Sequence, residues 1–130
     1  MVWIDDCLLD SVMEQAGKSP RLRMNYNFHK SLDAKAQRLL NALKVGTELP
    51  IHRHRHTIET YVLLRGRIDV LFYDDRKVLQ NRIHLDPKRE LYGLNIPEGQ
   101  WHTLEVLEDS VLFEVKDGPY MPLQEEDMLR

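Results

Sequence analysis

The first 28 residues contain two different hydrophobic patterns. Apolar residues recur at helical spacing over residues 4–16, and Gly17 stands where a helix commonly ends. Pro20 blocks any continuation of that helix. Over residues 21–28 polar and apolar side chains alternate, which is typical of a half-buried strand. The sequence therefore predicts a helix followed by a strand with one polar face.

A second helix is expected over residues 33–43. Asp33 or Ser31 can act as its N-cap, and Leu39, Leu40 and Leu43 would form its buried side. Residues 1–44 are therefore expected to be an N-terminal helical and strand extension that packs on the rest of the chain.

After Gly46 the chain changes to short segments rich in strand-forming residues, separated by turn residues such as Gly66 and Gly99. We expect strands over residues 47–56, 60–65, 67–73, 78–85, 92–96, 101–107 and 111–115. No helical pattern lies between them, so they indicate an antiparallel sandwich or barrel over residues 45–118. Residues 119–130 are expected to form a C-terminal arm of the same structural domain.

The composition narrows the classes of function. The chain has 130 residues, 42% of them hydrophobic, and a formal net charge of -3, which argues against a nucleic-acid-binding surface. The single cysteine, Cys7, excludes an internal disulfide and suits a reducing compartment. No apolar run approaches the ~20 residues of a membrane-spanning helix, and no basic segment precedes an apolar one at the start. We expect a cytoplasmic protein with neither nucleic-acid nor membrane partners.

Four of the six histidines lie in two short segments. His52, His54 and His56 alternate with arginines, and on a strand these three rings would share one face. Two imidazoles on such a face can hold one metal ion. Glu59 follows after a turn or bulge, and His102 stands at the head of a later strand. The residues alone leave two interpretations open, a metal site or a basic strip on the surface.

The spacing of these residues resembles the two signature motifs of the cupin superfamily. The matching positions are Gly46, His52, His54, Glu59 and Gly66 in the first motif and Pro97, Gly99 and His102 in the second. The resemblance implies an all-β fold, a small cupin (a double-stranded β-helix or jelly-roll barrel) with an N-terminal helix and strand extension. It also implies that His52, His54, Glu59 and His102 bind a divalent metal. The alternative set of His54, His56 and Glu59 fits the family spacing poorly, and Val106 stands where cupins commonly have asparagine.

Further segments resemble the WbuC-type cupin metalloproteins. They are S-P-R-x-R-x-N-x-N-x-H from Ser19, Q-R-x-L-N-A-L from Gln37, G-Q-W-H-T from Gly99 and F-E-V-K-D-G-P-Y from Phe113. The resemblance covers most of the chain. It implies a place in bacterial surface-polysaccharide (O-antigen) gene clusters, and no reaction is established for the family.

Polar positions from two parts of the sequence are candidate substrate contacts. Arg21, Arg23, Asn27 and His29 share the polar side of the first strand, and His56 and Tyr61 are in phase with the expected ligands. The polar face of the first strand either lies against solvent or closes the mouth of the barrel. In the second case Arg21 or Arg23 could hold an anionic or heavily hydroxylated ligand. No catalytic residue beyond the metal ligands can be named.

Three imidazoles and one carboxylate suit Zn, Fe, Mn, Ni or Co, so the expected cofactor is one divalent first-row transition metal per chain. The resemblance is compatible with a metal-dependent sugar isomerase or epimerase, with a non-catalytic ligand-binding or sensing module, or with an iron dioxygenase. We favour an enzyme that acts on a small sugar-like or anionic metabolite, and we expect a homodimer because a short barrel leaves open strand edges.

Overall fold

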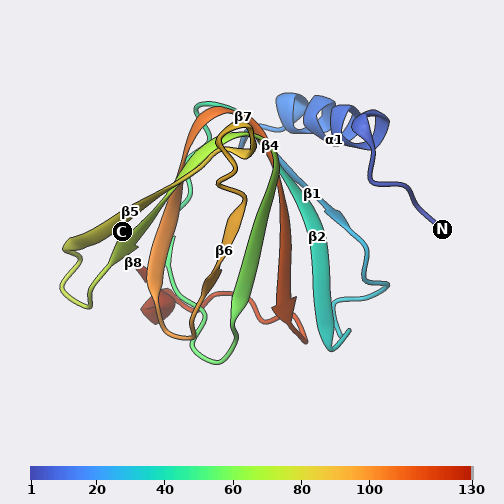
Figure 1. Ribbon diagram of the computed structural model, residues 1–130. Helices are drawn as coiled ribbons and strands as arrows, with labels where there is room; N and C mark the ends of the chain where they lie inside the picture. Colours follow the sequence, from blue (N-terminus) through green and yellow to red (C-terminus); the bar gives the residue numbers. More distant parts are fainter. Residues whose placement is uncertain (130) are drawn as a thin grey trace.

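The computed structural model describes residues 1–129, which fold into a bent antiparallel barrel with one helix outside it (Figure 1). The elements are, in order, α1 (Asp6–Lys18), β1 (Arg23–Asn27), β2 (Ala36–Leu43), β3 (Ile51–His52), β4 (Glu59–Tyr73), β5 (Leu79–Leu85), the 3₁₀ helix η1 (Pro87–Arg89), β6 (Gly93–Ile96), β7 (Trp101–Asp117), the 3₁₀ helix η2 (Glu125–Asp127) and β8 (Met128–Leu129).

Two long strands, β4 and β7, form the frame of the barrel. They pair antiparallel over almost their whole length, and their register shifts around Arg65 and Arg67. Such shifts let a strand bend from one side of a barrel to the other. At the bend Gly66 has a φ of +94°, and a Cβ there would lie 2.1 Å from Ser110 Oγ. Only glycine allows β4 to pass so close to β7 in this conformation.

The remaining strands extend this frame on both sides. β7 also pairs with β2, and β2 carries β1 at its other edge. β5 and β6 both pair with β4. The short β3 pairs with β7 and with β8. Together the strands form the jelly-roll barrel that the sequence predicts.

The first helix confirms the prediction for the N-terminus. Asp5 caps α1 by accepting a hydrogen bond from the Leu8 backbone N–H at 3.0 Å. One face of the helix packs outside the sheet beside β1 and β2 (Figure 1). The apolar residues at this contact are Leu9, Val12 and Ala16 of α1 with Leu40, Ala42 and Val111 of the sheet. Burial of this face fixes the helix against β1 and β2.

The expected second helix is wrong, because residues 36–43 form the strand β2. Both faces of β2 are covered. Leu40 and Ala42 lie under α1, whereas Gln37 and Asn41 line a cavity on the other side. A strand with apolar residues on both faces loses its two-residue alternation, and three leucines then imitate helical spacing.

The expected strand over residues 47–56 is also shorter than predicted. Its regular part is only β3, which ends at His52. Residues 53–58 continue as a loop, and the C-terminal β8 lies along β3 with His52 opposite Met128. The C-terminal arm thus ends as an added edge strand and not only as a surface segment.

The barrel interior has an apolar end and a polar end. The apolar cluster contains Leu43, Leu63, Ile68, Val70, Leu85, Ile96, Leu104, Val106 and Leu112, which are all buried. At the other end the interior opens into a polar cavity. None of the described helices is long and apolar enough to cross a membrane.

Candidate metal centre and its cavity

Two histidines meet at the polar end because their strands are neighbours. His52 of β3 lies opposite His102 of β7, and the ring centroids are 4.4 Å apart. The Nδ1 of His52 lies 2.9 Å from the Pro50 carbonyl, and the Nδ1 of His102 lies 2.9 Å from the Gln100 carbonyl. A carbonyl oxygen only accepts, so both Nδ1 atoms carry the hydrogen and both Nε2 atoms keep a free lone pair.

His54 and Glu59 complete the group from the loop and from the first residue of β4. Glu59 Oε1 lies 3.3 Å from His102 Nε2 and 3.6 Å from His54 Nε2. One ligand atom from each of His52, His54, Glu59 and His102 lies within 4.8 Å of the others. The strand alternation expected for residues 52–56 stops at His52, and it is the loop that turns His54 inward.

The electrostatics of the group favour an unprotonated imidazole at His52 and an ionised carboxylate at Glu59. Burial, and then the neighbouring His102, lower the pKa of His52 to about 4. Burial is also the main reason for the lowered pKa of His54. For Glu59, burial by itself raises the pKa, but His102 and His54 outweigh it and keep the pKa below its usual value. Free imidazole lone pairs beside an ionised carboxylate are the form in which these side chains bind metal.

A second observation supports a cation among these side chains. Glu59 Oε1 is buried and has no hydrogen-bond partner among the described residues. A buried carboxylate oxygen without a donor is costly unless something positive is supplied. The donor set fits a divalent first-row metal, so this group could bind one.

His84 pairs with the carboxylate of Asp69, and this carboxylate differs from that of Glu59. His84 Nδ1 lies 2.6 Å from Asp69 Oδ1, and Arg82 donates to the other Asp69 oxygen at 2.8 Å. Arg82 also donates to Glu105 at 2.6 Å. Here the carboxylate oxygens already have donors, so the arrangement is an ion-pair network with no need of a metal.

Five of the six predicted substrate contacts line the same cavity as His52, His54 and Glu59. The cavity has a volume of about 510 Å³, and its walls include Arg21, Arg23, Asn27, His29 and Tyr61. The polar face of β1 therefore closes one side of the cavity. Tyr61 is buried, with its hydroxyl 3.5 Å from His102 Nε2. Whether these residues touch a substrate stays a prediction.

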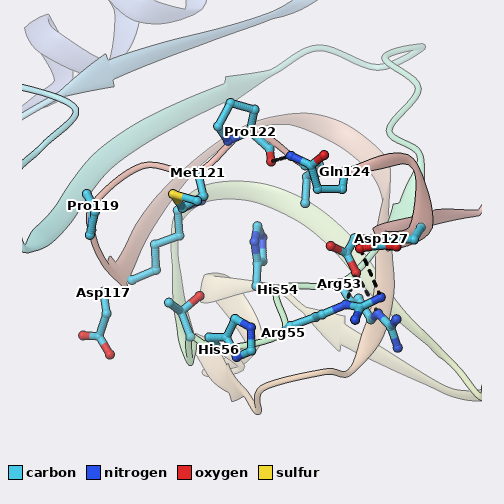
Figure 2. A pocket seen from close by; sticks show the side chains of 14 residues that line it. Arg53, His54, Arg55, His56, Asp117, Pro119, Met121, Pro122, Gln124 and Asp127 are labelled. Atoms are coloured by element: carbon cyan, nitrogen blue, oxygen red, sulfur yellow. Dashed lines mark hydrogen bonds and ion pairs between the residues drawn. The ribbon is translucent and has the colours of Figure 1, made fainter.

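His56 does not lie in this cavity. It lines a neighbouring pocket of about 310 Å³ between residues 53–57 and the C-terminal arm (Figure 2). Figure 2 shows the arm passing over the loop, with Asp127 held by two arginines. Arg53 and Arg55 each donate from Nε to Asp127 Oδ1, at 3.0 and 2.6 Å. Since β3 ends at His52, the expected common face of His52, His54 and His56 does not exist.

Some polar residues of the cavity were not among the predicted contacts, and four of them come from β2 and β7. They are Gln37 and Asn41 on β2 and Glu114 and Lys116 on β7. The first two were hidden because residues 33–43 were interpreted as a helix. The other two carry a signal, since polar residues at 114 and 116 alternate with Phe113 and Val115 on a strand.

Glu114 is the most unusual of these groups. Burial, and then the negative charge of Glu59, raise its pKa. The positive charge of Lys116, and then hydrogen bonds with Asn41 and Tyr61, oppose this rise without cancelling it. Asn41 Oδ1 and His29 Nε2 are also buried, and neither has a hydrogen-bond partner among residues 1–129. The cavity therefore places several polar groups whose partners are not supplied by the chain itself.

A jelly-roll barrel with three imidazoles and one carboxylate at its polar end defines a small cupin. A family model described as "Domain of unknown function (DUF6016)" matches residues 4–85, and the chain belongs to this family. No curated protein sequence matches the chain.

Solved structures share the cupin fold at low sequence identity. CapF, a capsular polysaccharide assembling protein from Staphylococcus aureus, gives a TM-score of 0.65 at 19% identity, covering 85% of this chain and 32% of CapF. KdgF from Halomonas sp. gives 0.60 at 16% identity over 79% of this chain and 84% of KdgF. A cupin superfamily protein from Desulfitobacterium hafniense gives 0.59 at 16% identity over 73% and 76%. This chain thus spans about a third of CapF, and the likeness concerns the fold alone.

Proposed function

We propose that this protein is a WbuC-type cupin that binds one divalent metal through His52, His54, Glu59 and His102. We further propose that it acts on a small sugar-like metabolite of surface-polysaccharide metabolism, as a cytoplasmic homodimer. The buried Glu59 Oε1, without a partner and facing imidazole Nε2 atoms at 3.3 and 3.6 Å, is the observation that carries the metal site.

Two further observations support the choice of metabolite. The motifs from Ser19, Gln37, Gly99 and Phe113 resemble WbuC-type proteins, which belong to surface-polysaccharide gene clusters. CapF, which shares the fold, is a capsular polysaccharide assembling protein. The cavity walls, with Arg23, Asn41 and Glu114, suit a polar ligand better than an apolar one.

When bound, the metal would act as a Lewis acid that polarises a carbonyl or hydroxyl oxygen. The chain itself would orient the ligand and limit its contact with water. Tyr61 lies beside His102 at 3.5 Å and beside Glu114, so it is placed to hold a ligand oxygen next to the metal group. An isomerase or epimerase needs this combination of a fixed oxygen and a polarising centre.

Metal content measures the first part of the proposal. The full chain, purified without a nickel column, should contain about one equivalent of Zn, Fe, Mn or Ni by elemental mass spectrometry. His54→Ala and His102→Ala should lose the metal, since each removes one of four ligands. His56→Ala and His84→Ala are matched controls that should keep it, because these rings lie outside the cluster. Equal metal content in all four variants would place the site elsewhere.

Turnover measures the second part. We expect the metal-loaded chain, and not His102→Ala, to convert a nucleotide sugar or deoxysugar intermediate to an isomer detected by NMR. A sugar that binds and is recovered unchanged would favour a ligand-binding or sensing module. Oxygen consumption that depends on Fe(II) would identify a dioxygenase. Light scattering of the same sample checks the homodimer.

A further inference from the structure

The cavity that contains the candidate metal group also contains three positively charged side chains. Arg21, Arg23 and Lys116 line the cavity. Within residues 1–129 none of the three forms an ion pair with an acidic side chain. Arginines elsewhere in the fold do so, for example Arg65 with Asp10 at 2.6 Å. The cavity arginines thus differ from Arg53, Arg55, Arg65, Arg67 and Arg82, each of which forms an ion pair with an acidic side chain.

The two arginines are held close together by the local backbone. Arg23 Nη1 donates to the Glu48 carbonyl at 3.0 Å, and Thr47 Oγ1 donates to the Arg21 carbonyl at 2.7 Å. Leu22 between the arginines has a φ of 58°, a conformation that costs energy for a leucine. Burial, and then the charge of Arg21, lower the pKa of Arg23. The fold keeps two like charges together although this is unfavourable, and an anion between them would relieve the repulsion.

The charge balance of the whole cavity points the same way. Its acidic groups are Glu59 and Glu114, and burial raises the pKa of Glu114. Three cations and a divalent metal exceed these two carboxylates even when both are ionised. The chain as a whole has a net charge of -3. A positive cavity in an acidic protein concentrates and selects anions.

Uncharged polar groups in the wall define the rest of the ligand. Asn41 Oδ1 and His29 Nε2 are buried and have no hydrogen-bond partner in the described part of the chain, although the Asn41 side chain is hydrogen-bonded to Glu114. Amide and carboxyl oxygens of this kind accept hydrogen bonds from hydroxyl groups. A ligand that satisfies them carries hydroxyls as well as charge.

We propose that the cavity binds a small hydroxylated anion, with its carboxylate or phosphate against Arg21 and Arg23 and its hydroxyl groups toward the metal ligands. This assignment rests on the proposed metal site and adds the ligand class to it. Both arginines present forked N–H donors that match either anionic group. Lys116 of β7 lines the same cavity and acts electrostatically on His54, so it adds a third positive charge.

Calorimetric titration of the zinc-loaded full chain tests this with three probes: D-glucuronate, D-glucose 6-phosphate and D-glucose. One of the two anions should bind at least about tenfold more tightly than glucose, because the interaction with arginine is charge-assisted. Whichever anion binds more tightly identifies the carboxylate or the phosphate as the preferred group. Glucose binding as tightly as both anions would overturn the proposal.

Variants assign the effect to the arginines. Arg21→Gln combined with Arg23→Gln should weaken the preferred anion by about tenfold or more and leave zinc content unchanged. Arg21→Gln alone, at an exposed position, gives a smaller loss and serves if the double variant unfolds. Arg38→Gln is the matched control, because Arg38 is exposed on β2 and does not line the cavity. An equal loss of anion affinity in Arg38→Gln and Arg21→Gln would mean that only the net charge matters, and would overturn the proposal.

Failure of this proposal is distinguishable from failure of the metal site. A chain that takes up zinc but binds no anion overturns the ligand class and leaves the metal site standing. A chain that takes up no zinc but still binds glucuronate, with loss in the arginine variants, overturns the metal site and leaves the anion subsite.

Discussion

The two ends of the barrel interior are built from the same strands but serve different purposes. β4 contributes Glu59 to the polar end and Ile68 to the apolar end, and β7 contributes His102 and Leu112 in the same way. At the apolar end the buried side chains pack against one another. At the polar end Glu59 Oε1, Asn41 Oδ1 and His29 Nε2 have no hydrogen-bond partner among the residues that the structure describes.

This difference indicates that the apolar end stabilises the fold and that the polar end is available for binding. The apolar end supplies stability through buried area, at roughly 25 cal/mol per Å² of apolar surface. At the polar end, buried lone pairs and charges without partners lower the stability of the folded state, which is common at functional sites. A change at one end should therefore alter stability with little effect on binding, and a change at the other end should do the reverse.

The largest effect is expected at the apolar end. Leu112→Ala should lower the free energy of unfolding by about 2–5 kcal/mol, because the side chain is fully buried and leaves a cavity. Zinc content of the folded protein should stay at the wild-type level. Urea denaturation followed by circular dichroism measures the first quantity, and elemental analysis the second.

A matched control keeps this prediction sharp. Leu79→Ala on β5 removes the same atoms from a side chain that is 46% exposed, and it should change the free energy of unfolding by less than about 0.5 kcal/mol. If Leu112→Ala also released the metal at a temperature where it is folded, the two ends would not be independent.

The architecture was largely predictable because alternation and turn residues report on strands exposed on one face. β1 follows this rule, the helical spacing of apolar residues predicted α1 in the same way, and turn residues marked the ends of β5 and β6. β2 does not, since Leu40 on one side lies under α1 and Asn41 on the other faces the cavity. Burial of both faces is a tertiary effect, and the local sequence contains no record of it.

The grouping of His52, His54, Glu59 and His102 was predictable for a different reason. Its four members were identified from motif spacing, not from strand geometry. The geometric expectation, that His52, His54 and His56 share a face, fails because β3 ends at His52. The loop direction depends on contacts with the C-terminal arm some 70 residues later, such as Arg53 with Asp127. Long-range contacts of this kind leave no signature near the histidines themselves.

An intermediate effect is expected where the polar end is anchored to the C-terminal arm. Asp127 accepts from Arg53 and Arg55, which flank His54, and its backbone carbonyl accepts from the Arg53 N–H at 3.0 Å. Asp127→Asn removes the charge and should loosen the loop. We expect zinc affinity to fall about tenfold, as found for groups that orient metal ligands indirectly, with a smaller loss of stability.

Competition with a chromophoric chelator measures this affinity. Glu126→Gln is the control, since Glu126 is exposed and approaches Arg55 only at 3.7 Å. Its affinity should match the wild type. An unchanged affinity in Asp127→Asn would show that the arm does not position His54.

The smallest effect is expected on the outer face, at the ion-pair network that belongs to neither end. Burial alone would raise the pKa of Asp69, but hydrogen bonds from Arg82 and His84 outweigh it and lower the pKa. A lowered folded-state pKa gives stability that is present above the ordinary aspartate pKa and is lost as the pH falls through the folded-state value. Asp69→Asn should therefore lower the free energy of unfolding by less than about 1 kcal/mol at pH 7, because Arg82 is well exposed. The difference in free energy of unfolding between this variant and the wild type should disappear below about pH 4. Thermal unfolding at pH 7 and pH 3 measures both, with zinc content unchanged at pH 7. A stability difference that increased in acid would mean that Asp69 is stabilised as the neutral acid. Asp69 would then not be the ion-paired carboxylate that contrasts with Glu59.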